Sequence, residues 1–152
     1  MHMERDTHSK VVGYILWFFG FTGAHRFYYG KQLTGALWFC TCGFFLIGWL
    51  IDIFLIPGMD EEADSKYEPG KHDYTVSWIL LTFFGIAGIH RFYLGNYGTG
   101  IMHLAAFCAL GALSFVFTPI VMAPLALVQL YDLFSLNGQV TEANTRAGTI
   151  SV

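Results

Sequence analysis

A few polar side chains in an otherwise apolar chain have the types that allow chemistry. They are His25-Arg26, His90-Arg91, Asp52 and Asp132. An arginine guanidinium binds phosphate or carboxylate through paired hydrogen bonds. An acid inside an apolar run is a candidate for proton or ion movement. The residue types therefore indicate anion binding by the arginines and proton or ion transfer by the aspartates.

The basic pairs lie in an internal repeat. The segment from Gly20 to Gly30 reads GFTGAHRFYYG, and the segment from Gly85 to Gly95 reads GIAGIHRFYLG. The copies are 65 residues apart, and the match continues through a Thr-Gly pair shortly after each. A pattern this long does not recur by chance in 152 residues, so the chain is a tandem repeat.

The repeated HRFY segment, which we call the corner, has two interpretations. It offers a basic surface for a lipid phosphate or a partner's carboxylate, or its arginines cap helix carbonyls and anchor the corner at the membrane surface. The candidate binding residues are His25, Arg26, Phe27, Tyr28 and Gly30, with His90, Arg91, Phe92, Tyr93 and Gly95. No carboxylate or thiol set accompanies the histidines, so we expect no metal or cofactor site.

The two aspartates stand in similar surroundings, WLIDIF for Asp52 and QLYDLF for Asp132. Proton or ion transfer is one interpretation, and anchoring at the interface opposite the corner is the other. On one straight helix, Asp52 would lie about 25 Å from the corner. We therefore expect no pairing between Asp52 and Arg26. A single His103 is expected to bond to a neighbouring helix.

Composition indicates a membrane protein. Hydrophobic residues make up 55% of the chain and charged residues 12%, whereas a soluble domain is about 25% charged. A soluble fold this small has too little interior for so much apolar surface. The net charge of −3 gives no sign of nucleic-acid binding. The sequence shows no nucleophile with an evident base, and it shows no phosphate-binding loop. We therefore do not expect this protein to be an enzyme.

The repeat predicts the membrane-spanning elements. An apolar run of 14 residues precedes each corner, over residues 11–24 and 76–89. Each makes a helix of about 21 Å, which we expect as a short crossing extended by the corner's aromatic residues. The following run of the first copy, residues 35–56, has the length of a transmembrane helix and is expected to stop at Pro57-Gly58.

The second copy is longer after its corner. There are 32 positions from Gly100 to Asp132, against 17 from Gly35 to Asp52. A straight helix over the longer stretch would measure about 48 Å, too long for a hydrocarbon core of about 30 Å. Its two prolines predict either one bent helix or a turn and a further crossing, giving four or five crossings. Both copies enter from one side, so both corners face the same side, opposite the linker between the repeats.

The expected fold is all-α, a polytopic transmembrane helical bundle of two tandem parallel helical hairpins. The segments are an N-terminal tail (1–10), a first hairpin (11–56), an acidic linker (57–74), a second hairpin with an inserted, proline-broken segment (75–136) and a C-terminal tail (137–152). The glycines Gly20, Gly23, Gly85 and Gly88 are expected to let the helices pack closely.

The repeated GxxGxHRFYxG corner, followed by an apolar run with an aspartate, resembles the TM2 domain family over residues 9–56 and 75–135. The resemblance implies helical hairpins joined by a short corner on the cytoplasmic side. It implies receptor-like or signalling-associated roles in animals and no defined role in microbes. The matching residues are Gly20, Gly23, His25, Arg26, Phe27, Tyr28, Gly30, Gly35 and Asp52, then Gly85, Gly88, His90, Arg91, Phe92, Tyr93, Gly95, Gly100 and Asp132.

The function expected from the sequence is a structural or interaction role in a membrane. The corners would bind lipid headgroups or a partner, either a second copy of the chain or another membrane protein. The alternative is a small oligomeric ion or proton channel or transporter that uses Asp52 and Asp132. Without a signal peptide or a glycosylated ectodomain in the sequence, the expected location is a bacterial inner membrane.

Overall fold

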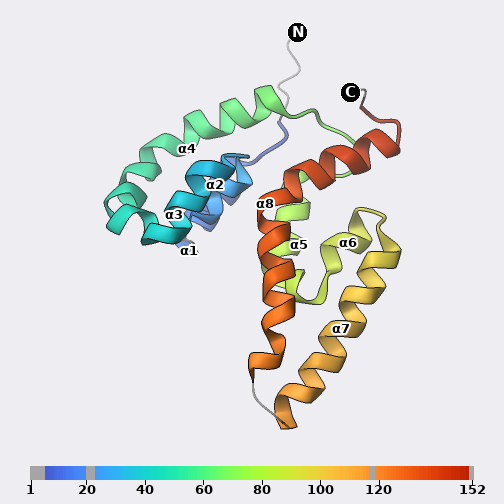
Figure 1. Ribbon diagram of the computed structural model, residues 1–152. Coiled ribbons are helices and arrows are strands. Elements are labelled where there is room, and N and C mark those ends of the chain that lie inside the picture. Colours follow the sequence, from blue (N-terminus) through green and yellow to red (C-terminus); the bar gives the residue numbers. More distant parts are fainter. Residues whose placement is uncertain (1–5, 20–22, 117–118, 151–152) are drawn as a thin grey trace.

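The computed structural model describes residues 6–19, 23–116 and 119–150, and every regular element in these ranges is a helix (Figure 1). The first repeat contains α1 (Lys10–Phe19), α2 (Ala24–Tyr28), α3 (Gln32–Phe45) and α4 (Ile47–Lys66). The second contains α5 (Tyr74–Phe84), the 3₁₀ turn η1 (Gly85–Ala87), α6 (Ile89–Tyr93), α7 (Tyr97–Val116), the 3₁₀ turn η2 (Pro119–Met122) and α8 (Ala123–Arg146). The expected all-α class is confirmed.

Each corner returns to the end of the molecule from which its repeat starts. The Tyr28 hydroxyl accepts a hydrogen bond of 2.6 Å from the amide of Ser9, just before α1. The Tyr93 hydroxyl accepts a similar bond of 2.8 Å from the amide of Asp73, just before α5. The expectation that the first apolar run carries the corner to the far side of the membrane is therefore wrong.

Glycines explain why the chain turns back. Gly23 and Gly88, directly before the two corner helices, have φ angles of 85° and 75°. An L-residue with a side chain pays a steric penalty in this left-handed region, and glycine does not. The helices before these turns have 10 and 11 residues, about 15 Å and 17 Å, or half of a bilayer's hydrocarbon core.

The run expected as one helix over residues 35–56 is two antiparallel helices. The backbone from Cys42 to Leu46 has positive φ angles throughout, which reverses the chain between α3 and α4. Gly48 allows the two helices to approach, because a Cβ there would lie 2.7 Å from the Trp38 ring. The prediction of a straight helix overlooked this reversal.

Helix α4 continues past Pro57 to Lys66, so the expected stop at Pro57-Gly58 is also wrong. Proline has no amide hydrogen and would leave the carbonyl of Ile53, four residues earlier, without its helical donor. The hydroxyl of Tyr14, on α1, donates to that carbonyl at 3.2 Å. A neighbouring helix thus replaces the missing bond.

The second repeat forms a longer hairpin, and the structure selects the turn over the bent helix. Its arms are α7 with 20 residues and α8 with 24, joined through η2. Within the described residues, two stretches are long and apolar enough to cross a membrane, Tyr97–Ser114 and Pro119–Arg146. Only 11% and 17% of their apolar windows are buried in the protein, so most of both surfaces faces outward.

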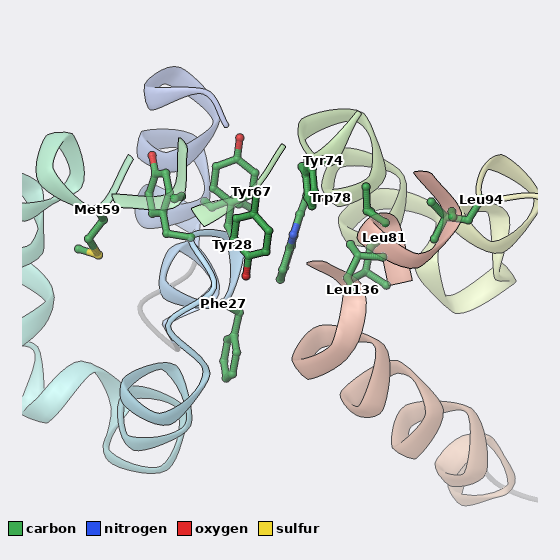
Figure 2. Packing of buried hydrophobic residues seen from close by; sticks show 14 of the residues in the cluster. Phe27, Tyr28, Met59, Tyr67, Tyr74, Trp78, Leu81, Leu94 and Leu136 are labelled. Carbon is green, nitrogen blue, oxygen red and sulfur yellow. The ribbon is translucent and has the colours of Figure 1, made fainter. Parts of the chain in front are cut away.

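The core lies where the two repeats meet, close to the linker. Figure 2 shows Tyr28 of the first repeat facing Trp78 of the second. The centroids of these two rings are 5.9 Å apart. The side chain of Asn137, on α8, accepts from the Trp78 indole at 2.6 Å and donates to the Tyr28 carbonyl at 2.8 Å. This buried amide ties α8 to the corner of the first repeat.

Candidate functional site

The first candidate site is a buried cluster of three side chains. Asp52 is 0% exposed and accepts from Nε of Arg26 at 2.9 Å, and it forms a second, short hydrogen bond with the Arg26 guanidinium. Nε2 of His25 lies 2.7 Å from the same carboxylate. The carboxylate thus binds both polar residues of the corner, and we call His25, Arg26 and Asp52 the first corner cluster.

The second repeat builds the same arrangement from His90, Arg91 and Asp132, the second corner cluster. One guanidinium nitrogen of Arg91 donates to both oxygens of Asp132 at 2.7 Å. Nε2 of His90 lies 3.1 Å from the carboxylate but outside hydrogen-bond geometry, and Gln139 supplies a further bond of 3.0 Å. Asp132 is also fully buried, so both acids of the apolar runs are neutralised inside their own repeat.

The expectation that Asp52 cannot pair with Arg26 is wrong, for a geometric reason. The estimate of about 25 Å assumed one straight helix, whereas the chain reverses after α3 and α4 runs back beside it. Asp52 on the returning helix therefore arrives at the corner. In the second repeat α8 returns in the same way, and Asp132 arrives at the equivalent place despite the longer hairpin.

Tryptophan residues hold the first returning helix against α1. The rings of Trp17 and Trp49 stack with centroids 4.5 Å apart, and each indole donates to the other residue's backbone carbonyl, at 2.7 and 2.9 Å. In the second repeat Gln129, the counterpart of Trp49, donates to the carbonyl of Leu81 on α5 at 3.1 Å. The sequence signal for this role was the shared position, three residues before each aspartate.

The arginine side chains lie inside the protein rather than on its surface. Arg26 is 7% exposed, and its guanidinium carbon lies 3.8 Å from the centre of the Trp38 ring. The counterpart of Trp38 in the second repeat is His103, whose Nε2 lies 3.1 Å from the carbonyl of Ile86. The prediction that His103 bonds to a neighbouring helix is confirmed, since Ile86 lies in the short 3₁₀ helix η1. Sequence reasoning did not connect either residue with the corner.

The motif glycines have packing roles that the repeat reproduces. A Cβ on Gly35 would lie 3.0 Å from the Phe27 ring, and a Cβ on Gly100 would lie 3.0 Å from the Phe92 ring. Small residues at these positions let the helix after each corner, α3 or α7, pass directly over the corner phenylalanine. Gly20 lies outside the described residues.

Gly30 and Gly95 end the corners with φ angles of 74° and 75°. This left-handed backbone is accessible to glycine without strain. Together with the close contacts at the other motif glycines, it explains why the motif extends beyond the polar residues. Among the described residues, no group of three histidine, cysteine or acidic side chains is placed to hold a metal ion.

A histidine that sequence reasoning did not single out lies at the junction of the repeats. His8 is 1% exposed, and four tyrosine rings surround it, with centroids at 4.8 Å for Tyr28, 5.2 Å for Tyr74, 5.3 Å for Tyr67 and 6.1 Å for Tyr29. The carboxylate of Asp64 accepts the amide of His8 at 3.0 Å. The His8 ring of the N-terminal segment therefore contacts three other parts of the chain, which are α2, the linker and α5.

His8 predicts a pH-dependent stability. Burial lowers the pKa of His8 from 6.5 to about 4, and the Asp64 carboxylate only partly offsets this effect. Between these pH values the unfolded chain binds the proton and the folded protein does not, so acidification from pH 6.5 to 4 should destabilise the fold by up to about 3 kcal/mol. Unfolding measured over this range should show a smaller loss of stability for His8→Phe than for wild type.

The ionisation of Asp60 changes the stability of the fold in the opposite direction to that of His8. The pH dependence of wild type must therefore be compared with that of His8→Phe. Burial, with the Asp64 carboxylate nearby, raises the pKa of Asp60 to about 6. The folded protein binds that proton more tightly, and stability should rise as the pH falls through 6. This contribution is common to wild type and His8→Phe and cancels in their difference. Equal pH profiles for the two proteins would exclude the role assigned to His8.

Comparison with known proteins agrees with the duplicated geometry. The sequence profile described as "TM2 domain" matches the chain twice, over residues 6–54 and 70–121. The chain belongs to the TM2 domain family. Two matches to one profile also confirm the tandem repeat, and the membership supports a membrane protein.

Relatives match over part of their length. A TM2 domain-containing protein of Dictyostelium discoideum is 54% identical over 75 residues, which are 48% of this chain and 49% of the relative. TM2 domain-containing protein 1 of Homo sapiens is 51% identical over 47 residues, 31% of this chain and 23% of the relative. The chain therefore spans half or less of the length of these relatives. No solved structure matches the chain.

Proposed function

We propose that this protein is a multi-pass membrane protein with a structural or interaction role, in which both TM2 repeats enter the bilayer from one side. One observation carries the proposal: each repeat neutralises its intramembrane acid inside a corner cluster and exposes apolar side chains around it. Leu33, Phe45, Phe54, Met102 and Ile120 are between 72% and 90% exposed. Lipid is the solvent that suits such surfaces.

The polar ends of both repeats share one side of the protein. Nζ of Lys31, after the first corner, lies 2.5 Å from the Glu62 carboxylate at the end of α4. Arg146, at the end of α8, donates to the side chain of Asn96 after the second corner at 3.0 Å. The corners, the linker and the end of α8 therefore lie together, in contrast to the expectation that the corners lie opposite the linker.

This arrangement predicts the labelling of single cysteines in sealed membranes. The three native cysteines, which are exposed, would first be replaced by serine. Cysteines at Lys31, Glu61, Gly98 and Ala147 should then all react with an impermeant thiol reagent from the same side. Labelling of Lys31 and Gly98 from one side and of Glu61 and Ala147 from the other would exclude the proposed topology.

Two further probes measure how deeply each repeat enters the membrane. Ile120 lies at the turn beyond α7, whose 20 residues extend about 30 Å, and it should label from the opposite side. Phe45 follows a regular helix of about 15 Å from Gln32 to Thr41, and it should label from neither side. Labelling of Phe45 from the opposite side would show that the first repeat also crosses completely.

The corners are less suited to headgroup binding than their sequence indicates. Asp52 and Asp132 neutralise the two guanidinium groups, and the Arg26 and Arg91 side chains are 9% and 14% exposed. The interaction role that we propose therefore uses the apolar helix faces, with membrane lipid as the first partner. A second copy of the chain or another membrane protein is the alternative partner for the same faces.

No observation favours the channel or transporter alternative, because both aspartates are buried and paired with arginine. We also propose no enzymatic role. The bacterial inner membrane predicted from the sequence gains no support from the two relatives named above, which are eukaryotic.

A further inference from the structure

An apolar groove of about 350 Å³ lies between the two repeats. Val12, Ile15 and Leu16 of α1 face Trp78, Ile79 and Phe83 of α5 across it. These helices are equivalent elements, each the first helix of its repeat. The groove therefore follows the boundary between the repeats rather than the interior of either one.

At the polar end of this boundary, the Tyr28 hydroxyl links the segment before α1 to the start of α5. The Tyr28 hydroxyl accepts from the Ser9 amide at 2.6 Å, before α1, and lies 2.7 Å from the hydroxyl of Thr75 on α5. Beyond this point the buried side chains of Leu16 and Trp78, 6% and 1% exposed, contribute to the groove. The two helices are thus joined at the linker end and leave space between their apolar faces.

The chemistry of the lining selects the ligand. Among the described residues that line the groove, only Thr82 has a hydroxyl group and none is charged. A bound water needs two to four polar partners, so water does not fill this space stably. An empty space would forfeit the dispersion contacts of its walls. Apolar cavities of about 150 Å³ bind benzene, and this larger groove has room for a longer hydrocarbon.

The surroundings indicate where that hydrocarbon comes from. Ile15, Ile79 and Phe83 are 44%, 39% and 66% exposed, so the groove opens onto the apolar surface of the protein. In the membrane setting proposed above, on which this inference rests, that surface contacts lipid chains directly. We propose that the groove between α1 and α5 binds one acyl chain of a membrane lipid, which completes the packing between the repeats.

Native mass spectrometry of the full chain in a mild detergent tests the proposal. Wild type should retain the mass of one phospholipid. Ile15→Phe with Ile79→Phe adds volume inside the groove and should reduce the lipid-bound fraction at least about fivefold. The matched control, Ile101→Phe with Ile120→Phe, makes the same substitutions at residues 60% and 74% exposed on the hairpin of the second repeat. It should retain lipid as wild type does.

A second measurement detects acyl chains beside Trp78 in the protein whose groove is not filled. With Trp17, Trp38 and Trp49 replaced by phenylalanine, Trp78 is the only fluorophore of its kind. In vesicles of phosphatidylcholine brominated on its acyl chains, Trp78 fluorescence should fall at least about twofold relative to unbrominated vesicles. Adding the two groove substitutions should remove most of this quenching.

The outcomes separate this inference from the proposed function. Release of the protein from membranes by alkaline carbonate would contradict the membrane setting, and both proposals would fail. A membrane-retained protein without bound lipid, or with equal lipid retention in groove and control variants, would overturn the acyl-chain site alone. A lipid-free dimer would overturn it too, because a second copy would then cover the groove.

Discussion

Replacing Asp52 with alanine is expected to destabilise the protein by about 3–5 kcal/mol. The substitution leaves the guanidinium of Arg26, a residue that is 7% exposed, without its carboxylate. Breaking a buried ion pair from one side costs this much because the remaining charge stays desolvated. Asp132→Ala should have the same effect in the second repeat, since Asp132 is the ion-pair partner of Arg91. Unfolding titrations in detergent micelles measure both changes.

Two further variants determine whether the cost comes from the isolated charge. Glu62→Ala removes the partner of Lys31 in an exposed ion pair, with the Glu62 side chain 63% exposed, and should cost less than about 1 kcal/mol. Arg26→Leu with Asp52→Leu removes both charges and should recover most of the stability lost in Asp52→Ala. A double variant as unstable as Asp52→Ala would contradict this explanation and assign the loss to packing or to His25.

Replacing Gly88 with alanine is expected to cost about 2–5 kcal/mol. Its φ angle of 75° imposes a penalty of about 1–2 kcal/mol on a residue with a Cβ. That Cβ would also lie 2.9 Å from the Cβ of His103, and overpacking of this kind costs about 1–3 kcal/mol. The same titration measures the change in the free energy of unfolding.

Gly95 provides the matched control in the same repeat. Its φ angle is also 75°, but a Cβ there would meet nothing within 4 Å. Gly95→Ala should therefore cost only the backbone penalty of about 1–2 kcal/mol. The difference between the two variants measures the close approach of α7 to the corner. Equal effects would show that the His103 side chain moves aside without cost.

Several properties of this protein follow from the sequence alone. The 65-residue spacing of the two HRFY corners establishes the tandem repeat, and the apolar composition predicts helices in a membrane. The importance of Gly23, Gly88, Asp52 and Asp132 was also visible, because the glycines recur at the 65-residue spacing and the aspartates recur in similar surroundings. These features depend on residue type and order, which the chain carries without reference to its fold.

The direction of the chain between these residues was decided by tertiary structure. An apolar run of 14 residues has the same pattern whether it crosses a membrane or returns through a left-handed glycine at its end. The reversal from Cys42 to Leu46 has little local signal besides Gly43, and contacts distant in sequence, such as Trp17 with Trp49, hold α4 in place after it.

The pairing of each aspartate with its own corner is a consequence of these reversals. Asp52 is 26 residues from Arg26, and Asp132 is 41 residues from Arg91, yet both pairs make the same contact. On a straight helix this sequence separation would place each aspartate far from its arginine. Only the return of α4 and α8 toward the corners brings them together. Periodicity records which face of a helix is apolar, whereas the path of the chain depends on turns and on packing between helices.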